Sequence, residues 1–132
     1  MNMREIEVSA AIIIKNGMIF ITKRGYGEYK GFWEFPGGKL EKGESKEECL
    51  KREIKEELDA EIIIENYLTT IRYAYPTFNL IMHCFICHFK SSNLVLKEHE
   101  ESKYISINEF CNINFTPADK LLYNELEKYI KK

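Results

Sequence analysis

The sequence predicts a small α+β domain, and three observations support this fold class. The chain has 132 residues, which is room for one hydrophobic core and little else. It is 45% apolar and 13% aromatic, which is typical of a globular chain rather than a disordered one. Several β-rich runs are interrupted by stretches with the apolar periodicity of a helix. We therefore expect one domain over residues 1–132.

The first part of the chain is expected to form short strands joined by turns. Residues 5–15 are rich in β-branched side chains, and Asn16-Gly17 is a strong hairpin signal before a strand over 18–23. A loop rich in Gly and Tyr follows, and then a short strand over 32–35. At Pro36-Gly37-Gly38 the backbone is expected to turn tightly and to approach a ligand closely.

A helix is expected to begin after Ser45, because Ser45 and Glu48 have the spacing of a capping box. An apolar stripe at i, i+4 and i+8 would face the core. The stripe consists of Leu50, Ile54 and Leu58. Asp59 should end the helix in the left-handed conformation, which Asp tolerates.

The second half of the chain is expected to contain a long hairpin and a final helix. Pro76 marks the hairpin turn, and Pro117 suits the first turn of a helix. The expected elements are strands over 60–75, 78–89 and 104–107, a turn at 91–93 and a helix over 117–131.

Three glutamates of the first helix are spaced at i, i+3 and i+4, namely Glu53, Glu56 and Glu57. This spacing places them on one side of a single turn, where three anions repel one another unless a cation lies among them. Mg²⁺ binds a few carboxylates, keeps some water and takes its other ligands from phosphates, so the spacing predicts a magnesium site at the rim of a cleft. Glu47 and Lys51, at i and i+4, are explained equally well by a charged, solvated helix face.

The same segment resembles the Nudix box, whose pattern is G-x5-E-x7-R-E-U-x-E-E-x-G-U, with U an apolar residue. All charged positions are present with both gaps of the right length. The matching residues are Gly38, Glu44, Arg52, Glu53, Ile54, Glu56 and Glu57. The end of the box departs from the pattern, since Asp59-Ala60 replaces glycine and a bulky aliphatic residue. The resemblance implies the Nudix fold, a mixed β-sheet sandwiched between α-helices.

Nudix hydrolases cleave a nucleoside diphosphate linked to another group, and the resemblance also implies roles for residues of the box. The implied ligands of Mg²⁺, or of Mn²⁺, are the carbonyl of Gly38 and the side chains of Glu53, Glu56 and Glu57. Glu53 is also the expected base for the attacking water. At about 100° per residue, Arg52 should point away from the three glutamates and pair with Glu44, as an organiser of the site.

Further site residues are expected outside the box. By its spacing to Tyr104, Glu98 matches an extra metal ligand or base of MutT-type members, and an acidic solvated turn explains it equally well. Glu100 is the alternative if the loop register differs. Arg24 and Lys39 are candidates for phosphate contacts, and the forked guanidinium of Arg24 has the better geometry.

Two flanking segments indicate the branch of the family. Residues 32–39 resemble the entry of MutT-type nucleotide-pool sanitising enzymes and of CTP pyrophosphohydrolases, and 115–119 resemble the segment that presents a base-recognising residue. Asp119 stands where many MutT-type enzymes have Asn. An ionised Asp only accepts hydrogen bonds, which suits N7–H of 8-oxoguanine or the amine of cytosine. The structural alternative for Asp119 is an acid in the first turn of a helix, which the helix dipole favours. Phe78 is a candidate for stacking against the base.

We therefore expect a Mg²⁺-dependent, MutT-type pyrophosphohydrolase that converts nucleoside triphosphates such as 8-oxo-dGTP to the monophosphate and pyrophosphate, in nucleotide-pool sanitation and DNA repair. The alternatives, in order, are a CTP or dCTP pyrophosphohydrolase, an ADP-ribose hydrolase and a non-catalytic nucleotide-binding module. We expect a monomer or a small homo-oligomer.

Charge and composition restrict the partners and the compartment. The net charge of −2 argues against binding of nucleic-acid polymers. No apolar run approaches the ~20 residues of a membrane span, and the start carries no apolar signal segment. The four cysteines are therefore expected to be reduced thiols in the cytoplasm. Cys84 and Cys87 spell C-x-x-C, but on a strand they would face opposite sides and share no ligand.

Overall fold

The computed structural model describes residues 4–91 and 94–131. Its elements are β1 (Glu5–Lys15), β2 (Met18–Arg24), β3 (Trp33–Glu34), β4 (Gly37–Lys39), α1 (Lys46–Leu58), β5 (Ile62–Tyr75), β6 (Phe78–Phe89), β7 (His99–Ile105), the 3₁₀ helix η1 (Ile107–Asn112), α2 (Pro117–Lys120) and α3 (Tyr123–Ile130). The strands form one sheet in the order β3-β2-β1-β6-β5, in which β4 also pairs with β1 and β7 with β2. β1 and β6 are parallel, and the other pairs are antiparallel.

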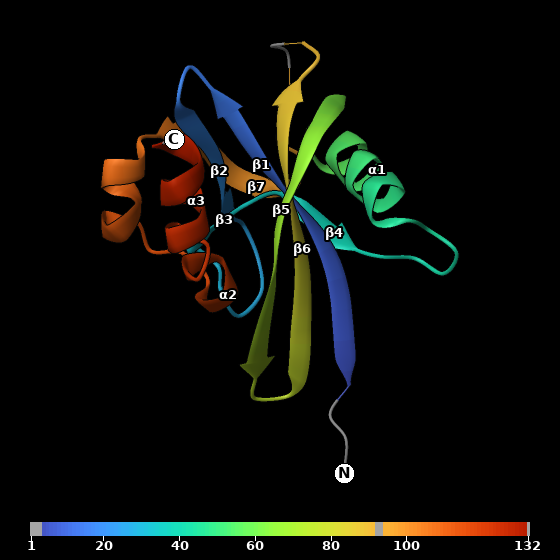
Figure 1. The fold of residues 1–132 in the computed structure, drawn as a ribbon. Coiled ribbons are helices and arrows are strands. Elements are labelled where there is room, and N and C mark those ends of the chain that lie inside the picture. The colour runs from blue at the N-terminus through green and yellow to red at the C-terminus, as the bar shows by residue number, and fades with distance from the viewer. Residues whose placement is uncertain (1–3, 92–93, 132) are drawn as a thin grey trace.

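Helices cover both faces of this sheet, with α1 on one side and η1, α2 and α3 on the other (Figure 1). The predicted mixed sheet between helices is confirmed. The long hairpin of β5 and β6 extends beyond the helices at its closed end (Figure 1).

The central strand β1 is apolar on both faces because each face is buried against a helical layer. Ala10 and Ile12 belong to the core beneath α3, whereas Ala11 and Ile13 belong to the core beneath α1. A strand buried on both sides has no polar face, which explains why its sequence shows a continuous apolar run rather than an alternation. On β6, Cys84 lies in the core beneath α3 and Cys87 lies in the core beneath α1. The two thiols therefore face opposite sides of the sheet, which agrees with the prediction that they share no ligand.

The helix α1 follows the signals of its sequence. Ser45 and Glu48 form a complete capping box, and Asp59 ends the helix in the left-handed conformation at φ 52°. The apolar stripe faces the core and has no exposed surface. The stripe residues are Leu50, Ile54 and Leu58.

Two expectations about the strands and turns were wrong. Gly37 and Gly38 form no tight turn; they lie in β4, which pairs with Ala10 and Ser9 of β1. The acidic stretch before Tyr104 is largely strand, because β7 begins at His99 and pairs with β2. Positions 92 and 93 of the expected turn lie outside the described residues.

The predicted C-terminal helix is divided into α2 and α3. Leu121 and Leu122 have ψ values of −10° and −12°, so the chain turns more tightly there than in an α-helix. This turn keeps Leu122 and Leu126 fully buried while it leaves Leu121 half exposed. The 3₁₀ helix η1 was not expected, although the capping-box pair of Ser106 and Glu109 marks its start.

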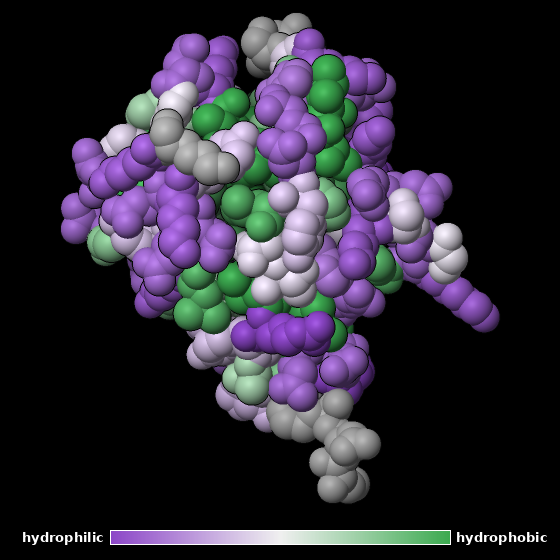
Figure 2. Space-filling view, in the orientation of Figure 1, coloured by the Kyte–Doolittle hydropathy of each residue, from purple (hydrophilic) through white to green (hydrophobic). Residues whose placement is uncertain are grey.

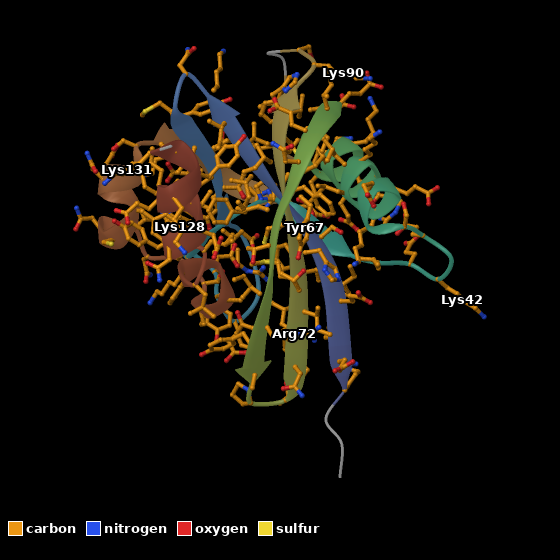
Figure 3. The ribbon with its side chains drawn as sticks, viewed as in Figure 1. Lys42, Tyr67, Arg72, Lys90, Lys128 and Lys131 are labelled. Carbon is orange, nitrogen blue, oxygen red and sulfur yellow. The ribbon has the colours of Figure 1, made fainter. Side chains whose placement is uncertain are left out.

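Hydrophilic side chains cover the two helical layers in the view of Figure 2, and apolar side chains gather between them, along the sheet. Lys128 and Lys131 point outward from the C-terminal helix, Lys42 points outward from the loop before α1, and Tyr67 lies on the edge strand β5 (Figure 3). In the described part of the chain, every helix is too short or too polar to cross a membrane.

Candidate active site

A cleft of about 840 Å³ brings together residues that are far apart in the sequence. Parts of β1, β2, β4, α1, β6 and α2 line it. The lining includes most of the predicted site residues, which are Arg24, Gly38, Lys39, Glu53, Glu57, Phe78, Glu98 and Asp119. Glu44, Arg52 and Glu56 do not line the cleft. A second hollow, of about 870 Å³, lies between α1 and β5 and contains none of the three box glutamates, so we assign the chemistry to the first.

The two glycines of β4 allow this strand to lie between β1 and α1. A Cβ atom on Gly37 would overlap the carbonyl of Ser9, and a Cβ atom on Gly38 would overlap the carboxyl group of Glu53. Strand pairing, rather than a turn, therefore brings the backbone of Gly38 close to the carboxyl group of Glu53. The expected close approach of this backbone to a ligand stays a prediction. Ser9 ties β1 to the start of α1, because its hydroxyl donates to the carbonyl of Lys46 at 2.9 Å.

Arg52 connects the loop before α1 with the glutamates of the helix. Its Nε and Nη2 donate to the two oxygens of Glu44 at 2.6 and 2.9 Å, so the predicted ion pair is present. Its Nη1 donates to Glu53 at 2.8 Å and to Glu56 at 3.1 Å. The expectation that Arg52 points away from the glutamates was therefore wrong, because its long side chain folds back over the next turn of the helix.

The charge of Arg52 has a clear electrostatic effect on Glu44. Hydrogen bonds from the guanidinium, together with one from the backbone of Glu41, lower the pKa of Glu44 to about 2. Nη2 of Arg52 also donates to the carbonyl of Lys39 at 3.0 Å, which links the helix to β4. Arg52 thereby joins three segments at the edge of the cleft.

Glu57 is the most buried carboxylate of the box, with 7% of its surface exposed. Burial raises its pKa well above the usual range, and the nearby Glu53, Glu34 and Glu98 add to this effect. Its Oε2 atom is buried and has no hydrogen-bond partner among the described residues. A carboxylate oxygen left unpaired among other acids is a suitable ligand for a hard cation, which would also reverse the repulsion.

Glu53 and Glu98 accompany Glu57 in the cleft, whereas Glu56 lies outside it and is 58% exposed at its side chain. In residues 4–91 and 94–131, no three acidic, imidazole or thiol groups are already gathered as a metal centre. The donor set nevertheless fits Mg²⁺, since it consists of carboxylates, a nearby backbone carbonyl at Gly38 and the unpaired oxygen of Glu57.

The acidic stretch near β7 separates into two sets of contacts. Glu98 lines the cleft, while Glu100 and Glu101 lie within 3.8 and 3.3 Å of Lys23 on β2. The alternative register, in which Glu100 would face the site, is therefore disfavoured. Gly25 packs closely against this stretch, because a Cβ atom there would lie 2.9 Å from the carbonyl oxygen of Glu98.

Asp119 also lines the cleft, from the short helix α2. It is 6% exposed, and its Oδ2 accepts a hydrogen bond of 2.8 Å from the backbone N–H of Phe35. Burial, followed by the charge of Glu34, raises the pKa of Asp119 to about 7. Both the carboxylate and the neutral acid are thus accessible near neutral pH, and they differ in whether they can donate a hydrogen bond.

Phe78 belongs to an aromatic wall beside Asp119. Its ring stacks on Tyr75, with the centroids 5.0 Å apart and the planes at 20°. The hydroxyl of Tyr75 accepts a hydrogen bond from the backbone N–H of Ala118, next to Asp119. This hydrogen bond connects the aromatic wall of Tyr75 and Phe78 to the helix that carries Asp119.

Several cleft residues were not expected from the sequence, among them Tyr26, Glu34, Tyr75 and His99. Glu34 lies within the segment 32–39 that resembles MutT-type enzymes, and His99 follows the candidate ligand Glu98, but neither was predicted as a site residue. Their roles depend on contacts between strands, which no local pattern reveals.

Comparisons with known proteins show which chains this one is similar to. The family model of the NUDIX domain matches residues 4–128. The CTP pyrophosphohydrolase of Escherichia coli K12 is 33% identical over 120 residues, which cover 89% of this chain and 87% of that protein. The 8-oxo-dGTP diphosphatase of Buchnera aphidicola subsp. Schizaphis graminum is 30% identical over 129 residues, or 97% of this chain and 98% of that protein. The crystal structure of the MutT protein from Methanosarcina mazei Go1 superimposes with a TM-score of 0.88 at 20% identity, and covers 100% of this chain and 99% of that one.

Proposed function

This chain belongs to the Nudix family, and we propose that it hydrolyses nucleoside triphosphates to the monophosphate and pyrophosphate, with 8-oxo-dGTP as the preferred substrate. One observation carries the proposal: a single cleft is lined both by two box carboxylates, Glu53 and Glu57, and by Asp119 with the aromatic wall. Relatives that cover almost the whole chain are named 8-oxo-dGTP diphosphatase, which supports the same substrate class.

In the proposed reaction, Mg²⁺ would be held by Glu53, Glu57, Glu98 and the carbonyl of Gly38, all of which line the cleft. Glu56, the remaining predicted ligand, lies outside the cleft and would not hold the cation in the arrangement that the structure shows. When bound, the cation neutralises phosphate charge and makes water more acidic. Glu53 accepts a proton from the attacking water, and Arg52 holds Glu53 in position through the bond from its Nη1. Arg24 and Lys39 bind phosphate oxygens, and the positive charge of both stabilises the charge that develops on the leaving pyrophosphate.

Asp119 reads the base in this proposal. The ionised carboxylate accepts a hydrogen bond from N7–H of 8-oxoguanine, a donor that guanine lacks at that position. The neutral acid could instead donate to a carbonyl, and its pKa of about 7 makes both forms relevant. Phe78, stacked on Tyr75, offers an apolar face to the base.

A second candidate substrate is CTP or dCTP. The observation in its favour is the 33% identity to a protein named CTP pyrophosphohydrolase. The amine of cytosine is also a donor, so an ionised Asp119 suits it as well.

The test compares the hydrolysis of 8-oxo-dGTP, dGTP, CTP, dCTP and ADP-ribose in the presence of Mg²⁺. Pyrophosphate release measures cleavage of the four triphosphates, and formation of AMP and ribose 5-phosphate measures cleavage of ADP-ribose. The proposal predicts the highest kcat/KM for 8-oxo-dGTP. Asp119→Ala should reduce the preference for 8-oxo-dGTP over dGTP about tenfold or more, because one base-specific hydrogen bond is lost. Asn124→Ala, an exposed change on α3, is the control. A higher kcat/KM for CTP would favour the second candidate, and an unchanged preference in Asp119→Ala would remove Asp119 from base recognition.

A further inference from the structure

His99 is a buried side chain of the cleft that the roles above do not explain. It is the first residue of β7, and only 5% of its side chain is exposed. Its Nε2 lies 3.1 Å from Oε2 of Glu34. Since a carboxylate only accepts hydrogen bonds, Nε2 carries the hydrogen and donates it. The Nδ1 atom is buried and has no partner among the described residues.

Glu34 is shared between His99 and Arg24. Its Oε1 accepts a hydrogen bond of 2.9 Å from Nη1 of Arg24, while its Oε2 faces the imidazole. Both oxygens are thus engaged, and the carboxylate cannot rotate without breaking one of the two bonds. Glu34 is 19% exposed at its side chain, so water competes little for these contacts.

Three strands deliver these three side chains to one place. β2 lies between β3 and β7, and Arg24 pairs with His99 across the β2–β7 ladder. The ladder register shifts between Lys23 and Arg24. An irregularity of this kind redirects the next side chain, and it is common beside active sites. Here it accompanies the turn of Arg24 toward Glu34 and into the cleft.

The guanidinium of Arg24 is confined on its other sides as well. Its Cζ lies 5.5 Å from the ring centroid of Tyr26, and its Nη2 is 3.6 Å from the position that a Cβ atom of Gly27 would take. Its Nε is buried without a partner among the described residues. The bond that Nη1 donates to Glu34 therefore fixes the orientation of the guanidinium, whose Nη2 is left to donate to a ligand in the cleft.

We infer that His99 and Glu34 are positioning residues, which hold the guanidinium of Arg24 in the orientation that binds the phosphates of the substrate. His99 acts through Glu34 and touches no reacting atom. This inference rests on the proposed function, because it assigns the phosphates of a nucleoside triphosphate to Arg24. A merely structural role of His99, as a link between β3 and β7, would predict a loss of stability without a specific loss of substrate affinity.

Two variants of His99 separate these roles. The amide nitrogen of His99→Gln reaches as far as Nε2 and can donate to Glu34, whereas that of His99→Asn replaces only Nδ1 and is too short. We expect His99→Asn to raise KM about tenfold with kcat within about twofold, and His99→Gln to stay within about threefold of the wild type. His88→Gln is the control, because His88 bonds to Glu65 outside the cleft. Thermal melting checks that each variant is folded.

A double-mutant comparison tests whether His99 acts through Arg24. Once Arg24 is replaced by Ala, adding His99→Asn should change KM less than about twofold, because the group that it positions is absent. A loss of kcat at unchanged KM, an equal loss in both His99 variants, or additive effects with Arg24→Ala would each overturn the inference.

Binding of the α,β-methylene analogue of dGTP, measured by calorimetry, keeps this inference distinct from the proposed function. If the wild-type protein binds the analogue but hydrolyses no nucleotide, the proposed function fails, and the dissociation constants still test His99. His99→Asn should then weaken binding about tenfold, and His99→Gln should restore it. Equal binding by the wild type and His99→Asn would contradict the inference, as would a wild type that does not bind the analogue.

Discussion

Arg52 and Glu44 are joined by two hydrogen bonds, from Nε to Oε2 at 2.6 Å and from Nη2 to Oε1 at 2.9 Å. Forked pairs of this kind fix the plane of both groups. Since the same guanidinium donates to Glu53, the orientation of the proposed base depends on an ion pair that lies outside the cleft. Only arginine has enough donors in one plane to make all these contacts.

Arg52→Lys keeps the positive charge and loses the fork. We expect kcat to fall about 10–100-fold with a small change in KM, because Glu53 is no longer held in place. Steady-state kinetics at saturating Mg²⁺ measure this effect, and Lys51→Ala on the same helix is the control. Retention of kcat within about twofold would show that the charge alone is enough.

Gly38→Ala introduces a Cβ atom where the carboxyl group of Glu53 lies. The carboxylate must move, and a displacement of about 1 Å at a reacting group can lower the rate about 100-fold. We expect kcat to fall by about that factor while the protein stays folded. At Gly17, where a Cβ atom meets no described atom within 4 Å, replacement by Ala should lower stability through its φ of +75° and leave kcat unchanged. Equal kcat values for Gly38→Ala and the wild type would argue against the proposed role of Glu53.

Asp119 should make stability depend on pH. Its pKa is about 7 in the folded protein and 3.8 in an ordinary exposed Asp. At pH values between these two, the folded state therefore holds a proton that the unfolded state has lost. Its stabilising contribution is complete below pH ~4 and is lost as the pH rises to ~7. Asp119→Asn cannot titrate, so the free energy of unfolding of the wild type minus that of the variant should fall by up to about 1.4 kcal/mol per pH unit across this window. Urea unfolding at several pH values measures this difference in the free energy of unfolding. A difference that stays constant or rises with pH would contradict a buried Asp119 with a raised pKa.

The sequence predicts α1 well because the signals of this helix are local. The capping box at Ser45, the apolar stripe and Asp59 all lie within the helix or next to it, and each acts on its own turn. The box glutamates were therefore placed on a real helix, where Glu53 and Glu57 line the cleft and Glu56 does not. The hairpin of β5 and β6 was equally accessible, since Pro76 marks its turn and each strand is long and apolar.

Other features depend on contacts between residues that are distant in the sequence, and local patterns could not predict such features. β4 exists because Gly37 and Gly38 fit between β1 and α1, and β7 exists because β2 offers it a partner. Arg52 folds back on Glu53 and Glu56 because those carboxylates attract it, an effect that helical geometry alone does not include. His99 was missed for a similar reason, since its partner Glu34 is 65 positions away.

The most direct test of the central proposal is the Mg²⁺-dependent release of pyrophosphate from 8-oxo-dGTP by the wild type and by Glu53→Gln. We expect the wild type to yield the monophosphate and pyrophosphate, and Glu53→Gln to lower kcat about 10²–10⁴-fold. Glu47→Gln, an exposed change on the same helix, should stay within about twofold of the wild type. A Glu53→Gln protein with the wild-type rate would contradict the role of Glu53 as the base, and a wild type that releases orthophosphate instead of pyrophosphate would contradict the proposed reaction.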